Sequence, residues 1–362
     1  MIDSISRVWG ADSIAVVFSS SGNFAPFTYT TILSLVDCSN KINKYDIIIL
    51  ETDMNFNQKK MFEQLIGDRQ NISIRFYNVL KILSNYNLST NLYWTNDCYV
   101  KLLIPDILIE YTKAIYLDSD MIIKDDIAIL YNFDMKNASI GACRDPGIIA
   151  RICVLHMNDE KHAICRKYIN EKVCIKEKNL INFFCTATLL LNLDNIRVAY
   201  SSDDMMSYAM KNNFVHLDMD VFNSLFQDNV VFLPLEWGWA ATNNDNSDYI
   251  GRLYPSAPRE LYNEFISAGR NPKIIHYGGP NKPWIVIDRA AAEDFWIVFR
   301  RTPFYNSFIE QHLSVVQYKI MLSNYNKLNS AVKSLQRTEA LYHQWIDRLA
   351  KTLPYRLLRR IF

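Results

Sequence analysis

Short apolar runs with strand preference alternate with helical stretches in the first part of the chain, and this alternation restricts the fold more than any other feature. The strand-like runs are Ile14–Phe18, Asp46–Leu50, Ile72–Tyr77, Ala114–Leu117 and Ser139–Ala142, and the helical stretches lie near Ala25–Val36, Asn57–Ile66 and Asn96–Tyr111. The pattern predicts an α/β fold with a mostly parallel, doubly wound sheet, which binds ligands at the carboxyl ends of its strands. Because no Gly-x-Gly-x-x-Gly follows the first strand, a dinucleotide dehydrogenase is disfavoured.

Two carboxylates, Asp118 and Asp120, come directly after the fourth of these strands. Residues i and i+2 of an extended chain share a face, so both side chains can reach one hard cation. Mg²⁺ or Mn²⁺ bound in this way keeps coordination positions open for a diphosphate. An isolated Asp-x-Asp also occurs in solvated turns that begin a helix, with Asp125 and Asp126 as further surface acids, so the pair alone is compatible with either interpretation.

A second polar segment, Lys273–Trp284, follows another short apolar strand and favours the metal site. His276 offers a neutral third ligand, a Gly-Gly turn at 278–279 lets the backbone approach a phosphate, and Lys282 offers a positive charge for a diphosphate. The alternative is a surface turn rich in Gly and Pro with a buried Trp284. The density of useful groups favours phosphate binding.

Four segments resemble glycosyltransferase family 8, which includes bacterial lipopolysaccharide galactosyl- and glucosyltransferases and glycogenin. They are Tyr116-Leu-Asp118-Ser-Asp120, similar to the family's YLDxD; Leu189-Leu-Leu-Asn-Leu193, like its LLINL; Asp218-Met-Asp220-Val-Phe-Asn223, like its DQDxxN; and His276-Tyr-Gly-Gly-Pro-Asn-Lys282-Pro-Trp284, like its HxxGxxKPW. The resemblance runs from about Ile14 to Trp284. Four motifs in the right order are more specific than any one of them.

The resemblance implies a GT-A domain over residues 1–284, a nucleotide-diphosphate sugar donor such as UDP-galactose or UDP-glucose, a Mn²⁺ or Mg²⁺ ion, and hexose transfer with retention of anomeric configuration. By position, it implies metal ligands at Asp118, Asp120 and His276, donor contacts at Asn23, Phe24, Lys101, Ser119, Gly279 and Lys282, and catalytic roles for Asp218 and Asp120. Phe24 is expected to stack on the base, and Asp218 is expected near the donor sugar.

Three positions depart from the family pattern. Cys185 stands where the family has an Asn, Met219 replaces the Gln between the two acids of DQD, and Ser21 replaces a common Asp. Met219 cannot act as a nucleophile or front-face stabiliser. The alternative function is therefore a nucleotide-sugar-binding protein with reduced or lost transferase activity. A metal-dependent nucleotidyltransferase is disfavoured, because the segment after the first strand, Ser19–Asn23, has one glycine and no basic residue.

Net charge and cysteine content bear on the possible partners and on the cellular compartment. The net charge of +1 argues against broad nucleic-acid binding, and seven scattered cysteines favour thiols in a reducing compartment. Cys153-x-x-His156 and His162-x-x-Cys165 have zinc-like spacing, but we interpret them as unliganded. Because Met1–Ser6 lacks the features of a signal peptide and no long apolar window occurs, we expect a cytoplasmic protein, with peripheral contact to the cytoplasmic face of the inner membrane as an option.

The region 285–362 is expected to be helical. Apolar residues recur there every seven positions (Met321, Leu328, Leu335, Tyr342 and Leu349), with Tyr325, Val332 and Ile346 four later and Glu339 as an interruption. This spacing predicts a long amphipathic helix that either forms a homodimer or packs on the catalytic domain. Leu353–Phe362 interleaves three arginines with apolar residues, which suits an anionic membrane surface or an ordinary exposed helix end. Together with the family, this tail favours a lipid-linked acceptor such as lipopolysaccharide.

Two further regions have side chains suited to a glycan acceptor. Residues 147–182 are polar and irregular, preceded by Arg144 and Asp145, and either contact the acceptor or form a solvated helix face. Trp237 and Trp239, with the amide-rich loop 243–247, either line a sugar site or belong to the core.

Overall fold

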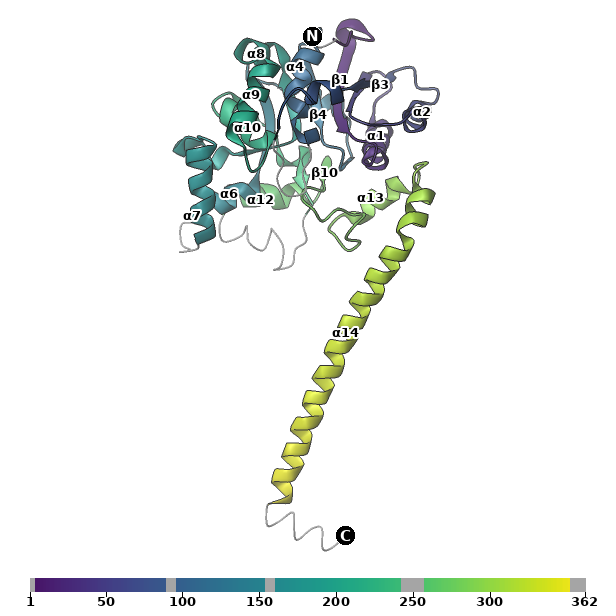
Figure 1. The fold of residues 1–362 in the computed structure, drawn as a ribbon, viewed down its shortest axis with the longest axis vertical. Coiled ribbons are helices and arrows are strands. Elements are labelled where there is room, and N and C mark those ends of the chain that lie inside the picture. Colours follow the sequence, from purple (N-terminus) through teal and green to yellow (C-terminus); the bar gives the residue numbers. More distant parts are fainter. Residues whose placement is uncertain (1–3, 89–95, 154–159, 242–256, 352–362) are drawn as a thin grey trace. The chain divides into compact units, whose positions relative to one another are not determined.

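The computed structural model describes residues 4–88, 96–153, 160–241 and 257–351 (Figure 1). The chain separates into two compact units, Met1–Tyr305 and Asn306–Phe362. A seven-stranded sheet in the order β3-β2-β1-β4-β7-β6-β8 forms the centre of the first unit. Its strands are β1 (Ser13–Ser20), β2 (Lys44–Glu51), β3 (Ile72–Asn78), β4 (Lys113–Leu117), β6 (Ile140–Arg144), β7 (Phe184–Asn192) and β8 (Val230–Phe232).

The sheet is parallel except for β7, which pairs antiparallel with both β4 and β6. Strands β1 and β2 are buried almost without interruption, as expected of strands covered on both faces. The predicted α/β fold with a mostly parallel sheet is therefore confirmed. The reversed strand was not among the predicted strands, although it contains all of the LLINL-like segment except Leu193, which begins α8. Its direction brings residues 184–187 beside the end of β4, where Asp118 N donates to Ala187 O at 2.9 Å.

The longer helices of the first unit are α1 (Ala25–Cys38), α2 (Phe56–Leu65), α6 (Pro146–Cys153), α7 (Glu160–Lys167), α8 (Leu193–Ala199), α9 (Ser202–Asn212), α10 (Asp218–Phe226), α12 (Arg259–Ala268) and α13 (Ala292–Phe299). Short helices are α3 (Leu80–Leu83), α4 (Ile104–Ile107) and α5 (Ile127–Tyr131), with 3-10 turns at η1 (Gly10–Asp12), η2 (Asn96–Leu103), η4 (Glu177–Asn182) and η5 (Leu235–Trp237) and a π-helical turn at η3 (Tyr168–Lys172). The single helix predicted near 96–111 is thus η2 followed by α4. Pro105 lies in the first turn of α4, where its missing N–H is tolerated, so a new helix begins there.

A second, three-stranded sheet joins segments that are distant in the sequence. β10 (Ile274–His276) lies between β5 (Met121–Ile123) and β9 (Trp239–Ala240). It runs antiparallel to β5 with His276 opposite Met121, one residue after Asp120. This register brings the segment around 276 beside the Asp118–Asp120 turn.

Residues 285–305, which the sequence analysis assigned to the C-terminal region, pack within the first unit through α13. Phe27 of α1 stacks on Trp284, with ring centroids 3.7 Å apart, and Phe295 and Phe299 of α13 complete the aromatic cluster. The division between catalytic and C-terminal regions at Trp284 stays a prediction.

The second unit consists mainly of α14 (Tyr305–Ala350), which Figure 1 shows as one continuous helix. The basic tail 353–362 lies outside the described residues. Among the residues that are described, no helix has both the length and the apolar character needed to cross a bilayer.

Candidate active site

The turn after β4 is held in place by the strand and by α1. Tyr116 OH donates to Asp118 Oδ1 at 2.9 Å. Ser119 is almost fully buried, and its hydroxyl donates to Ser19 O at 2.6 Å. The Thr31 hydroxyl of α1 lies 3.0 Å from Ser119 O and 2.9 Å from Met121 O. The backbone on both sides of Asp120 is therefore fixed, and the Ser119 side chain is engaged with the protein itself.

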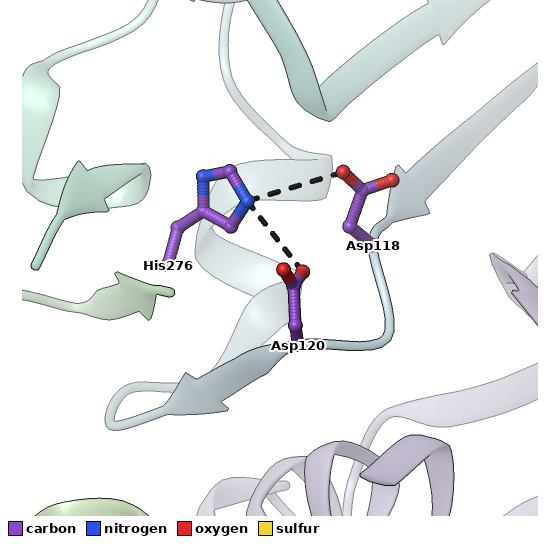
Figure 2. A group of neighbouring side chains, drawn as sticks. All are labelled: Asp118, Asp120 and His276. Atoms are coloured by element: carbon purple, nitrogen blue, oxygen red, sulfur yellow. Dashed lines mark ion pairs between the residues drawn. The ribbon is translucent and has the colours of Figure 1, made fainter. Parts of the chain in front are cut away.

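Asp118, Asp120 and His276 lie together at this turn (Figure 2). His276 Nε2 is 3.5 Å from Asp120 Oδ1 and 4.0 Å from Asp118 Oδ2. The three residues offer ligand atoms that all lie within 4.8 Å of one another. Asp118 is partly accessible, whereas the Asp120 and His276 side chains are 9% and 12% exposed.

The chemistry of these donors fits a divalent cation. Two carboxylates supply the hard oxygen ligands that Mg²⁺ and Mn²⁺ prefer, and an imidazole is accepted by Mn²⁺ and other transition metals. Three protein ligands leave further coordination positions for an oxyanion of a substrate. The grouping of the three side chains is thus suited to the metal site that the sequence suggests.

Lys282 adds positive charge to the same group. Its ammonium forms an ion pair with Asp120 and donates to Tyr277 O at 2.9 Å. Burial alone would raise the pKa of the Asp120 carboxyl, but the charges of Lys282 and His276 outweigh burial and lower it. Asp120 is accordingly held in its ionised form, which is the form that a metal ligand requires.

The turn that follows His276 depends on its glycines. A Cβ at Gly278 would lie 2.9 Å from His276 Cε1, so only glycine leaves the imidazole undisturbed. Gly279 has φ +78°, the left-handed region that favours glycine, with open space around it. Arg289 donates to Gly278 O and to Ala241 O, both at 2.8 Å, and so ties the turn to the end of β9. Arg289 was not among the predicted site residues, because it lies outside the motifs that carry the family resemblance.

Lys101 is buried between two acids. Its Nζ lies 2.7 Å from Asp218 Oδ2 and 3.3 Å from Asp118 Oδ1, and it donates to Thr186 O at 3.2 Å. Burial opposes its charge, but Asp118 and Asp218 raise the pKa of Lys101. For Asp218, burial raises the pKa against the lowering effect of Lys101. The family resemblance implies that Lys101 is a donor contact. In the structure its amine forms ion pairs with both the metal-ligand candidate Asp118 and the donor-sugar candidate Asp218.

The turn before α10 orients Asp218. Leu217 has φ +50°, a strained value for a branched residue. Asp220 is fully buried and accepts from Tyr168 OH at 2.5 Å and from His216 N at 2.8 Å. Of the two acids of this motif, Asp218 therefore pairs with Lys101, whereas Asp220 stabilises the preceding turn through its hydrogen bonds. Met219 between them is half-buried.

Asn223 connects α10 to the start of β7. Its side-chain amide accepts from Phe184 N at 2.9 Å and donates to Phe184 O at 2.7 Å. Cys185 follows on this strand, and burial raises the pKa of its thiol well above the ordinary value. The residue that departs from the family pattern is thus a neutral thiol beside Thr186, whose hydroxyl donates to Asp218 at 2.6 Å.

The proposed nucleoside residues lie at the start of α1. Asn23 is exposed, and the rings of Phe24 and Trp284 form a T-shaped pair with centroids 6.0 Å apart. Gly22 N donates to Asp53 Oδ1 at 2.6 Å, and Gln58 donates to Gly22 O at 2.7 Å. This turn is fixed by side chains from the loop after β2 and from α2.

The regions considered for an acceptor differ in environment. Trp237 is buried and Trp239 packs on Phe265, so both have core contacts. Asp145 accepts from Gly147 N and Ile148 N at the start of α6, and Arg144 pairs with Glu264. The loop 243–247 and His156 lie outside the described residues, as does the side chain of His162.

Known proteins resemble this chain in sequence. The sequence model for glycosyl transferase family 8 matches residues 15–288. A putative glycosyltransferase of Haemophilus influenzae is 23% identical over 277 residues, covering 76% of this chain and 74% of the relative. The lipopolysaccharide 1,2-glucosyltransferase of Escherichia coli is 23% identical over 192 residues, covering 53% of this chain and 50% of the relative.

Solved structures share the fold. The apo structure of the bifunctional glycosyltransferase WbbM aligns with a TM-score of 0.73 and 24% identity, covering 85% of this chain. This chain spans about half of WbbM, 53% of its length. The galactosyltransferase LgtC, solved with donor and acceptor sugar analogues, aligns with a TM-score of 0.63 and 18% identity, covering 80% of this chain and 96% of LgtC. The expected GT-A fold is confirmed.

Proposed function

Because this chain belongs to glycosyltransferase family 8 and is a hexosyltransferase, we propose that it transfers galactose or glucose from a nucleotide-diphosphate sugar to a saccharide acceptor. UDP-galactose or UDP-glucose is the proposed donor. One observation supports the proposal most: Asp118, Asp120 and His276, from two distant segments, offer ligand atoms within 4.8 Å of one another. We propose that they hold Mn²⁺ or Mg²⁺.

The charges around this group suit departure of a diphosphate. A bound divalent cation would supply positive charge for the leaving group. Lys282, which contacts Asp120, would place the positive charge of its ammonium near the diphosphate. As the bond from the anomeric carbon to the diphosphate oxygen breaks, negative charge develops on the leaving group and the sugar gains oxocarbenium character. The protein stabilises that charge without a side-chain acid.

The acceptor step needs no carboxylate base. The acceptor hydroxyl forms its bond to the anomeric carbon on the face that the diphosphate leaves, and its proton passes to the departing diphosphate oxygen. This route gives retention and suits a chain with Met219 where a nucleophile would otherwise be sought. Asp218, held by Lys101 and Thr186, would bind the donor sugar through its remaining acceptor capacity.

For the acceptor, we propose a lipid-linked saccharide such as lipopolysaccharide, reached at the cytoplasmic face of a membrane. The E. coli relative acts on lipopolysaccharide by name, and the tail 353–362 combines arginines with apolar residues. Each basic residue near an anionic surface adds about 1 kcal/mol to binding.

A donor screen tests the proposed function. Purified protein is incubated with a panel of nucleotide sugars with and without Mn²⁺, and release of the nucleoside diphosphate is measured. We expect Mn²⁺-dependent turnover of one hexose donor. Asp120→Ala should abolish it, whereas Asp125→Ala, which removes a nearby acid outside the group, should not. Full transfer by Asp120→Ala would exclude the proposed metal site.

Cys185 and Met219 motivate a second candidate, a nucleotide-sugar-binding protein with reduced or lost activity. The two candidates differ in one measurement. Calorimetric binding of a donor together with Mn²⁺, without hydrolysis or transfer to any acceptor in a panel of saccharides, would favour the binding protein.

A further inference from the structure

The C-terminal helix α14 carries an exposed apolar stripe. Tyr325, Leu328, Val332, Leu335 and Tyr342 follow one another at alternating spacings of four and three residues, except where Glu339 takes one place, and each is between 42% and 69% exposed. Ile346 continues the spacing. A straight helix drifts away from a strict seven-residue repeat, so a stripe that keeps this repeat predicts a left-handed supercoil with another helix.

The stripe is narrow, and its width distinguishes a helical partner from a membrane surface. The described positions that flank it are Asn324, Asn329, Ala331, Gln336, Thr338 and His343, with the apolar Trp345 near the end. The described charged residues in this stretch, apart from Glu339, occupy the outer positions. A bilayer surface takes up a broad apolar face, whereas a seam of two residues in seven fits a second helix. The geometry therefore favours a helical partner.

We propose that this partner is α14 of a second copy of the chain, in a parallel two-stranded coiled coil. The a positions are Tyr325, Val332, Glu339 and Ile346, and the d positions are Leu328, Leu335 and Tyr342. β-Branched residues at two of the a positions and Leu at two of the d positions favour two parallel strands. Coiled coils choose unlike partners through charges at the e and g positions. The described flanking positions carry no acid, Lys or Arg, so nothing there repels an identical helix.

The area is sufficient for a specific dimer. Two copies contribute twelve apolar seam side chains from the residues named above. If each removes on the order of 100 Å² from water, the interface buries roughly 1,200 Å², the lower limit for stable interfaces. The seam is continuous except at Glu339, which would face Glu339 of the second copy. Like charges at that position weaken the dimer and penalise shifted registers that place the acid opposite an apolar residue.

Sedimentation equilibrium of the full chain tests the proposal. We expect twice the 42.2 kDa chain mass. Leu335→Asp in the seam should raise the dissociation constant of the dimer by about a hundredfold or more, because two carboxylates would be buried. Leu341→Asp is the matched control: Leu341 is 65% exposed, close to 69% for Leu335, but lies at an outer position.

Two results would overturn the dimer. One is a monomeric wild-type chain, including a monomer that binds anionic vesicles through α14. The other is equal behaviour of Leu335→Asp and Leu341→Asp, since association would then use another surface. Donor turnover by the Leu335→Asp monomer, measured alongside, separates a failed dimer proposal from a failed assignment of the transferase.

The parallel register has its own test. In a parallel dimer, Ile346→Cys places two thiols at one layer, and mild oxidation should give a peptide linked 346 to 346. A dimer that forms no such link would overturn the parallel arrangement. Glu339→Gln removes two facing charges and should tighten the dimer by about tenfold; weaker association of this variant would contradict the register.

Discussion

Lys101 Nζ lies 2.7 Å from Asp218 Oδ2 in the interior of the protein, where 5% of the Lys101 side chain and 8% of the Asp218 side chain are exposed. The same ammonium is 3.3 Å from Asp118. One buried cation thus neutralises a metal-ligand candidate and a donor-sugar candidate, and it fixes their separation.

Lys101→Met is expected to destabilise the folded protein by about 3 kcal/mol, because the buried Asp218 would lose its counter-ion. Urea unfolding measures the loss. The control is Lys44→Met, which removes an exposed ion pair with Asp12 and should cost less than about 1 kcal/mol. Equal stability of the two variants would show that the Lys101 charge is not needed to compensate the acids.

Thr31→Val is expected to loosen the Asp118–Asp120 turn. The substitution keeps the volume but leaves Ser119 O and Met121 O without the hydroxyl, so it should cost about 1–2 kcal/mol in unfolding free energy and weaken Mn²⁺ binding. Thr30→Val is the matched control, because Thr30 bonds only within α1, to Pro26 O. Calorimetric titration with Mn²⁺ should distinguish them; identical metal affinity would contradict the role of Thr31.

Most of the fold and the family could be predicted from the sequence, because both depend on local signals. The strands before Asp118 are short apolar runs, and the acids follow where a parallel sheet binds ligands. The family motifs contain the candidate ligands themselves. The confirmed features are therefore those that neighbouring residues determine.

The contacts that support the site could not be predicted in this way, because each depends on strand register or on packing between distant segments. Nothing near Thr31 shows that it reaches the turn at 119–121, and nothing near His276 fixes its position opposite Met121. The reversed direction of β7 likewise follows from its neighbours in the sheet. The ion pairs of Lys101 likewise depend on packing, because Asp118 and Asp218 are distant from Lys101 or from each other in the sequence.

Tyr168→Phe is expected to disturb Asp218 through the preceding turn. The lost hydroxyl donates to the buried Asp220 and accepts from Val215 N at 2.7 Å, so the buried Asp220 carboxylate and the amide of the exposed Val215 each lose a partner. The KM for the donor should rise by about tenfold, equivalent to about 1.4 kcal/mol, with a smaller change in kcat. The control is Tyr208→Phe, which removes only the hydrogen bond between the Tyr208 hydroxyl of α9 and the Ser224 hydroxyl of α10. An unchanged KM would show that this turn does not position Asp218.

Gly278→Ala and Gly279→Ala should separate displacement of His276 from backbone strain. At Gly278 the added Cβ would lie 2.9 Å from the His276 ring, so the imidazole must move and Mn²⁺ affinity should fall at least tenfold, as expected when a ligand is displaced. At Gly279 the Cβ meets no atom, but φ is +78°, so the cost should be about 1 kcal/mol of stability with metal affinity largely kept. Unfolding and metal titrations on both variants give the comparison. If Gly278→Ala bound Mn²⁺ as well as the wild type, His276 would not be a ligand of the metal.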